Sequence, residues 1–303
     1  MTILNTQSDG LYPELIVLFR AVLFEKNILS VDLIKACSSP TESDEKIRGA
    51  LAKWESLGLF HRNQDQLTIN PGLLTKVNKP SIDELTASLP KIACQLIMND
   101  ENCLPLWANG QEDSEKGTGK TADFVRGLSW CLAQDIYTYP TDFNEINSIE
   151  NIQTKGNKKI LSNDTRYNAL RHWMRFLGFA TGDGVEFKID PTIAIRDCLP
   201  NIFSARDEIP ADEFVQLLQE RLPVIDYGAY RNQVEKNLNP QVWRKPNEKH
   251  LSISLSFALK RLDASNTIKL IGRADGGSGL NLTGQGYRTW GGFESVALIR
   301  RMS

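Results

Sequence analysis

The chain has 303 residues, about twice the usual size of one domain, so two or three domains are expected. It carries 35 basic and 37 acidic residues, and this balance excludes a protein that binds nucleic acid through bulk positive charge. Hydrophobic residues make up 41% and charged residues 24%, which is typical of folded globular chains and excludes extensive disorder.

The five cysteines and the N-terminal residues indicate the cellular compartment of the protein. The cysteines are odd in number and form no CxxC pair, so we expect reduced, mostly buried thiols rather than disulfides or a zinc site. The first residues lack a secretory signal, and the apolar run at 15–24 is too short to span a bilayer. The sequence therefore predicts a soluble, cytoplasmic protein without a membrane partner.

Residues 11–71 predict a helix, a short helix, a longer helix and a hairpin, which is the element order of a winged helix. Apolar residues recur at helical spacing over 15–23, and a second helix is expected from Ser30. A third is expected from Ser43, and Gly58 ends it and leads into short strands at 59–60 and 67–69. A helical bundle with an unrelated hairpin is the alternative, which the tight spacing after Gly58 disfavours.

The helix, glycine, strand, turn and strand order recurs twice. Over 122–190, a helix capped by Asp164 or Thr165 ends at Gly178 before strands around a turn at 182–184. Over 210–282, Ser252 begins a helix that is followed by a strand at 268–271, a glycine-rich turn and a return strand at 280–282.

We therefore predict a mainly α fold with small β wings (α+β), built from tandem winged-helix domains. The predicted divisions are winged helix 1 at 1–80, a connecting helix and linker at 81–121, winged helix 2 at 122–203, and winged helix 3 with a C-terminal tail at 204–303. Residues 137–163 follow no clear pattern.

One segment, GTGKT at 117–121, is typical of a nucleotide site, because a P-loop ends in GKT. The match is incomplete, since Ser114 stands where the first glycine belongs and no apolar strand precedes it. We interpret the segment as a polar linker that leads into a helix.

The isolated His61, His172 and His250 lack metal-binding spacing, so the sequence predicts no enzyme, no cofactor and no metal.

The polar faces of the three third helices are candidate DNA-binding surfaces, because that helix enters the major groove in this architecture. The candidate residues are Arg166, Asn168, Arg171, His172 and Arg175 in the second unit, Lys46, Arg48 and Lys53 in the first, and Lys260, Arg261 and Arg273 in the third. Arg288, Arg300 and Arg301 are further candidates for phosphate contacts. Ordinary solvated surface charge is the alternative for all of them.

Phe257 lies off the apolar face of its helix, which indicates a partner surface or a local packing contact.

The opening LNTQSDGL at 4–11, the segment LSISLSFALKRL at 251–262 and RAD at 273–275 resemble the DpdG family. That family belongs to bacterial gene clusters that install 7-deazaguanine derivatives in DNA and restrict unmodified DNA. The resemblance implies an accessory component of a DNA-modification or phage-defence system, working beside ATPases and nucleases of the same cluster. It supplies no active-site residues.

Three hypotheses follow. The first is a DNA-binding or adaptor subunit that holds a partner enzyme on double-stranded DNA. The second is a protein–protein scaffold that binds an ATPase or nuclease without DNA, like the tandem winged-helix elements of chromosome-organising complexes; the near-zero charge and Phe257 favour it. The third is a transcriptional regulator, which would leave most of this chain unexplained, since one winged helix per protomer suffices.

Overall fold

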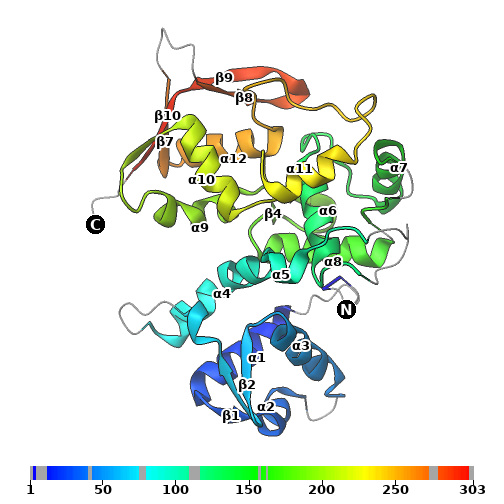
Figure 1. The fold of residues 1–303 in the computed structure, drawn as a ribbon, viewed down its shortest axis with the longest axis vertical. Helices are drawn as coiled ribbons and strands as arrows, with labels where there is room; N and C mark the ends of the chain where they lie inside the picture. The colour runs from blue at the N-terminus through cyan, green and yellow to red at the C-terminus, as the bar shows by residue number, and fades with distance from the viewer. Residues whose placement is uncertain are drawn as a thin grey trace.

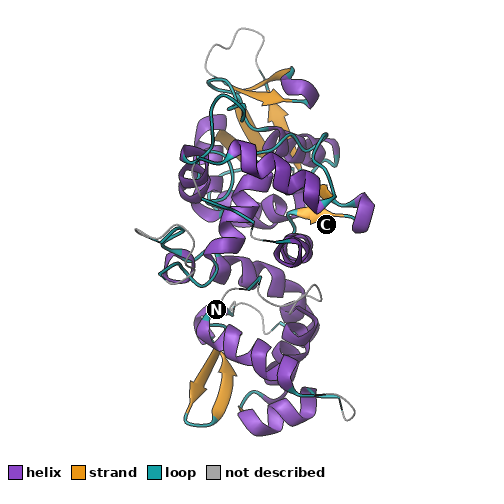
Figure 2. Cartoon of the chain, turned by 90° about the vertical axis from the view of Figure 1, so that its right-hand side faces the viewer, coloured by secondary structure: helices purple, strands orange, loops and turns teal. Residues whose placement is uncertain are grey.

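The computed structural model describes residues 3–4, 12–39, 43–74, 80–108, 117–155, 158–161, 163–272 and 279–299. Their fold is mixed α+β, with small antiparallel sheets beside many helices. The molecule is elongated, with the first unit at one end and strands β7 to β10 toward the other (Figures 1 and 2).

The first unit has the predicted order of elements and one additional strand. Its elements are α1 (Tyr12–Glu25), β1 (Ile28–Leu29), α2 (Ser30–Cys37), α3 (Glu45–Ser56), β2 (Phe60–Asn63) and β3 (Gln66–Ile69), followed by the short helix η1 (Pro71–Leu73). The two-residue strand β1 pairs with β3, so the sheet order is β1-β3-β2. Ser30 is the first residue of α2 rather than a side-chain cap.

The predicted connecting helix is α4 (Ile82–Ile97), which lies between the first unit and the rest of the chain (Figure 1). Ser81 and Glu84 begin it with a reciprocal capping box, in which each side chain accepts from the other residue's backbone N–H. The short helix α5 (Asp100–Cys103) follows.

The second unit contains three helices and a very short hairpin. Its elements are α6 (Ala122–Leu132), α7 (Phe143–Gln153), α8 (Asp164–Phe176), β4 (Ala180–Thr181), η2 (Gly184–Glu186) and β5 (Lys188–Ile189). Every residue of α6 is buried, so it is a central helix rather than an amphipathic surface helix. The cap of α8 was predicted wrongly: Asn163 accepts from the N–H of Arg166.

The third unit begins with a helix inside 122–203, the range predicted for winged helix 2, and has strands beyond 282, where the predicted third cycle ends. Its elements are α9 (Thr192–Ile202), β6 (Glu208–Pro210), α10 (Ala211–Arg221), α11 (Ala229–Lys236), α12 (Ile253–Ala264), β7 (Ile268–Ile271), β8 (Leu280–Thr283), η3 (Gln285–Tyr287), β9 (Thr289–Phe293) and β10 (Ser295–Leu298). Helix α9 contacts both α10 and α12, as α1 contacts α2 and α3 in the first unit. The strand order β6-β10-β7 likewise repeats β1-β3-β2.

The predicted pairing of the last hairpin was wrong. β7 pairs with β10 and β8 pairs with β9, instead of β7 with β8. Because Ile271 lies opposite Ser295 and Leu280 opposite Phe293, β7 and β8 are successive partners of one extended segment, 289–298. The predicted turn at 274–278 lies outside the described residues.

The junctions of α3 with β2, α8 with β4 and α12 with β7 share one hydrogen-bond pattern. The N–H of the residue after the left-handed position donates to a carbonyl in the last turn of the helix: Leu59 to Trp54 at 2.9 Å, Phe179 to Met174 at 2.7 Å, and Thr267 to Leu262 at 2.9 Å. Gly58 and Gly178 supply positive φ at the first two junctions and Asn266 at the third, as this helix ending requires. The prediction that Gly58 and Gly178 lead into paired strands is confirmed.

Candidate nucleic-acid interface

The second hairpin closes over the polar face of α8. The Arg171 guanidinium lies 4.6 Å from the centre of the Phe187 ring and donates to the carbonyl of Gly184. Arg175 Nη1 lies 2.9 Å from the Asp183 carboxylate. Arg166, Asn168 and His172 lie on the same helix and are all half-buried. The predicted residues thus share helix α8, and the two central arginines contact the hairpin loop of their own unit.

The third helices of the first two units pack against each other. The rings of Trp54 in α3 and Trp173 in α8 have centroids 5.8 Å apart, and both side chains are fully buried. Lys53 beside them is only 5% exposed; burial lowers its pKa, and the nearby Asp123 carboxylate opposes that shift. The prediction that Lys53 contacts DNA from the surface is wrong, because this side of α3 faces the second unit.

The exposed part of α3 carries balanced charge. Arg48 donates to the Asp44 carboxylate at 2.8 Å, and this bond holds the pKa of Asp44 below its usual value. On the adjacent strand, Arg62 forms a two-bond pair with Glu55 at 2.7 and 2.8 Å. Lys46 is exposed on the same helix. Most cations of this surface thus lie beside a carboxylate.

On α12, the predicted residues have different environments. Lys260 is exposed, whereas Arg261 forms an ion pair with the buried Asp190 at the junction before α9. Arg273, Arg300 and Arg301 lie outside the described residues. Phe257 is half-buried and takes part in an aromatic cluster that the sequence did not predict.

The aromatic cluster consists of Tyr137, Phe257 and Trp290. The Tyr137 ring contacts Phe257 at 6.1 Å and Trp290 at 6.3 Å between centroids, both edge to face. Tyr137 follows α6, Phe257 lies on α12 and Trp290 on β9, so three distant segments supply the rings. Tyr137 lies in the stretch 137–163, which follows no clear pattern, and no periodic signal marks Trp290. The sequence pointed to this cluster only through Phe257, which lies off the apolar face of its helix.

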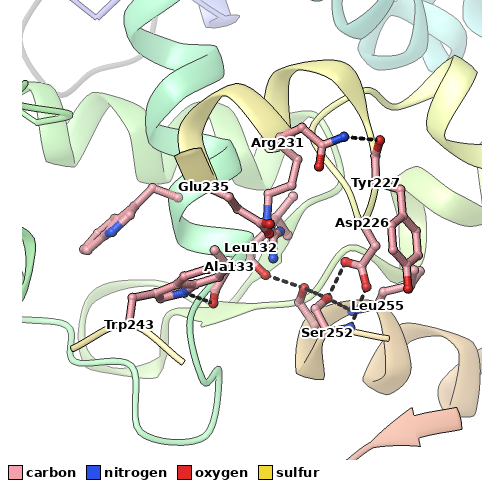
Figure 3. Close-up of polar contacts among 12 residues, drawn as sticks. Leu132, Ala133, Asp226, Tyr227, Arg231, Glu235, Trp243, Ser252 and Leu255 are labelled. Atoms are coloured by element: carbon pink, nitrogen blue, oxygen red, sulfur yellow. Dashed lines mark hydrogen bonds and ion pairs between the residues drawn. The ribbon is translucent and has the colours of Figure 1, made fainter. Parts of the chain in front are cut away.

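A buried polar network connects the carboxyl end of α6 to the start of α12 (Figure 3). Ser252 donates through its backbone N–H and its hydroxyl to the Asp226 carboxylate, each at 2.5 Å. The Ser254 hydroxyl donates to the carbonyl of Leu132 at 2.7 Å. Because these groups are buried, losing any partner would leave an unsatisfied polar atom in the interior.

The GTGKT segment is used for packing in the described structure. Lys120 Nζ donates to the carbonyl of Ser56 at 2.5 Å, and the Thr121 hydroxyl donates to that of Ile97 at 2.6 Å. Helix α6 begins at the next residue, as the linker interpretation predicts. Ser114 lies outside the described residues. The polar groups that a P-loop would turn toward phosphate instead connect α6 to α3 and α4.

A cavity of about 750 Å³ lies between α4, α9, α10 and the start of α11. Lys91 and Arg221 line it together with three acidic residues, Asp100, Asp197 and Glu220, so its walls carry charges of both signs. Burial raises the pKa of the Cys198 thiol in its wall to about 11. That thiol is therefore protonated at neutral pH and is a poor nucleophile or metal ligand.

A family model described as DpdG-like matches residues 1–276. The chain belongs to the DpdG-like family. This membership associates it with the Dpd modification system. No curated protein and no solved structure matches it. Within the described ranges of this DpdG-like chain, no helix is long and apolar enough to cross a membrane.

Proposed function

We propose that this DpdG-like chain is a non-catalytic winged-helix adaptor of the Dpd modification system, which binds ATPase or nuclease proteins of the same cluster. Two units support the winged-helix assignment. The order α1-β1-α2-α3-β2-β3 with sheet β1-β3-β2 is that of a winged helix. In the third unit, α9-β6-α10-α12-β7-β10 with sheet β6-β10-β7 repeats it, with α11 inserted before α12 and the β8–β9 ribbon before β10.

The contact between Trp54 and Trp173 carries the proposal for protein partners. It uses the carboxyl-terminal parts of two third helices inside the molecule, while Arg171 and Arg175 hold the second hairpin. A helix must present a solvent-exposed face to enter the major groove of a duplex. Helices that are packed inside the molecule or covered by a hairpin are therefore poorly placed to do so. The overall charge of -2 also gives no general attraction to DNA.

The first unit exposes apolar side chains that fit a protein partner. Phe24 at the end of α1 is 71% exposed and Val31 at the start of α2 is 70% exposed. Val17 and Leu29, from α1 and β1, are also exposed. Exposed apolar side chains gathered in one part of a protein are typical of an interaction surface. The first unit lies at one end of the molecule, where α2 and β1 are accessible (Figure 1).

Co-expression with each ATPase and nuclease of the cluster tests the proposal. We expect at least one stable complex on size-exclusion chromatography, lost in Phe24→Asp/Val31→Asp. Val185→Asp is the matched control, because Val185 is 89% exposed on the second hairpin. Failure of every cluster protein to bind, or equal binding by both variants, would contradict the proposal.

Duplex DNA binding through the first unit is the second candidate, and the exposure of Lys46 favours it. The amino-terminal half of α3 and the turn of the β2–β3 hairpin are open to solvent. A groove contact there would weaken as salt rises, and Lys46→Glu would abolish it. Duplex retention that is independent of salt and of Lys46→Glu would remove this candidate.

A further inference from the structure

The aromatic cluster lies at the surface between α12 and the β8–β9 ribbon. Tyr137 is 38% exposed, and Phe257 and Trp290 are half-buried. Both contacts within the cluster are edge to face, at interplanar angles of 90° and 77°. Rings arranged in this way do not cover both faces of one another, so the cluster retains aromatic surface for a further flat group.

Arginine side chains lie over one ring of the cluster and over a neighbouring ring of the same ribbon. Arg261 lies 5.7 Å from the Phe257 ring, and Arg244 lies 4.4 Å from the ring of Tyr287, three residues before Trp290. Arg288 precedes Trp290 of the cluster by two residues. Burial raises the pKa of the Tyr137 phenol, and the positive charge of Arg288 opposes that shift. Arg244 and Arg288 are both exposed.

The charged groups beside these rings include two exposed arginines, Arg244 and Arg288, and one carboxylate. That carboxylate is Asp135, whose negative charge helps to raise the pKa of both Tyr137 and Tyr287. Asp190 neutralises Arg261, so Arg244 and Arg288 remain to contact an anionic ligand. Aromatic faces flanked by exposed guanidinium groups form the combination that binds single-stranded nucleic acid.

We infer that the aromatic cluster, with Arg244 and Arg288, binds single-stranded DNA by stacking unpaired bases on its rings. Duplex DNA does not fit, because its bases are already stacked on one another. A protein partner is less favoured, since the exposed cations call for a ligand with regularly spaced negative charge. The inference is independent of the adaptor proposal, because none of these residues lies in the first unit.

The backbone supports a fixed position for Trp290. A Cβ atom at Gly284 would lie 2.0 Å from the indole nitrogen, so the absence of a side chain lets the ring lie against the chain. The His250 ring, on the segment that follows Arg244, bonds to the Thr289 hydroxyl at 3.1 Å. Both features connect the ribbon to its surroundings, and an ordered ring loses less entropy when a base stacks on it.

Fluorescence anisotropy of the full chain with a labelled oligothymidylate of about 12 nucleotides tests the inference. We expect the single strand to bind more tightly than a duplex of equal length. Tyr137→Ala and Trp290→Ala should each weaken binding about tenfold, whereas Tyr137→Phe should bind within about twofold of the wild type. Arg288→Ala should reduce the slope of log affinity against log salt by about 0.7, the value for one phosphate of a single strand.

Val185→Ala is the control, because it removes an exposed apolar side chain outside both proposed binding surfaces and should leave single-strand affinity unchanged. Thermal melting of each variant distinguishes lost stacking from lost folding. No single-strand binding at low salt, equal affinity for the duplex, or unchanged affinity in folded Tyr137→Ala and Trp290→Ala would each overturn the inference. A different result would assign the surface to a protein partner. In that case the wild type binds no single-stranded DNA, and Tyr137→Ala loses a complex with an ATPase or nuclease encoded in the same gene cluster.

Discussion

Trp54 of α3 and Trp173 of α8 lie in direct ring contact, 5.8 Å between centroids, and neither is exposed to solvent. Each belongs to the third helix of its unit, so the first and second units share a core. Lys53, next to Trp54 in the chain, is also buried, and the Asp123 carboxylate opposes the lowering of its pKa. The side of α3 that carries Trp54 is therefore buried against the second unit, and only the opposite side is available to a partner.

Removing either indole should destabilise the whole chain. Trp54→Ala or Trp173→Ala leaves a large cavity in the shared core, and we expect a loss of about 3–5 kcal/mol in the free energy of unfolding. Urea denaturation followed by circular dichroism measures it. Phe24→Ala, at an exposed position, should change stability by less than about 0.5 kcal/mol. A similar small effect at Trp173 would show that the units fold separately.

Arg171 should hold the second hairpin loop closed. Arg171→Ala removes the contact with the Phe187 ring and the bond to the Gly184 carbonyl. Cleavage at Glu186 by a glutamate-specific protease should then accelerate several-fold, because the loop opens more often. Lys46→Ala is the control, since Lys46 is exposed on α3. Equal cleavage rates for Arg171→Ala and the wild type would mean that other contacts close the loop.

The cysteines should differ in their reaction with iodoacetamide. Cys37 is half-buried, and burial raises the pKa of its thiol without enclosing it. The pKa values of Cys103 and Cys198 are raised to about 11, so their thiolate fraction at pH 8 is very small and grows only as the pH approaches 11. Mass spectrometry should find Cys37 modified first at pH 8, and all five cysteines modified in urea. Early labelling of Cys198 would contradict the buried geometry.

Glu150 should make stability depend on pH. Its carboxylate is 1% exposed and accepts from the N–H groups of Ile160 and Leu161, and burial raises its pKa above 4.5. The folded state therefore binds the proton more tightly, so this contribution to stability is present below pH 4.5 and is lost as the pH rises through the raised value.

Glu150→Gln keeps an oxygen for the two amides and carries no charge. It should raise the melting temperature at pH 7 by a few degrees, and the difference from the wild type should shrink as the pH falls toward 4.5. Differential scanning calorimetry between pH 5 and 8 measures it. A difference that stays constant over this range would mean that Glu150 does not titrate there.

The sequence alone determined the three helices of the first unit and the glycines at which two third helices end. Gly58 and Gly178 were identified because a helix ending needs one left-handed residue, and glycine adopts that conformation at little cost. The capping box at Ser81 and the helix start at Ser252 are likewise set within a few residues. Helix caps and helix endings depend on residues within about one helical turn of each other. They can therefore be predicted from the local sequence.

The tertiary structure decided which surfaces stay open. Lys53 and Lys46 look alike in sequence, but only Lys53 faces a second helix. The pairing of β7 with β10, and the meeting of Tyr137 with Phe257 and Trp290, join segments that are distant along the chain. These choices depend on how much apolar surface the complete fold buries, and that free energy is a property of the packed molecule rather than of any one segment.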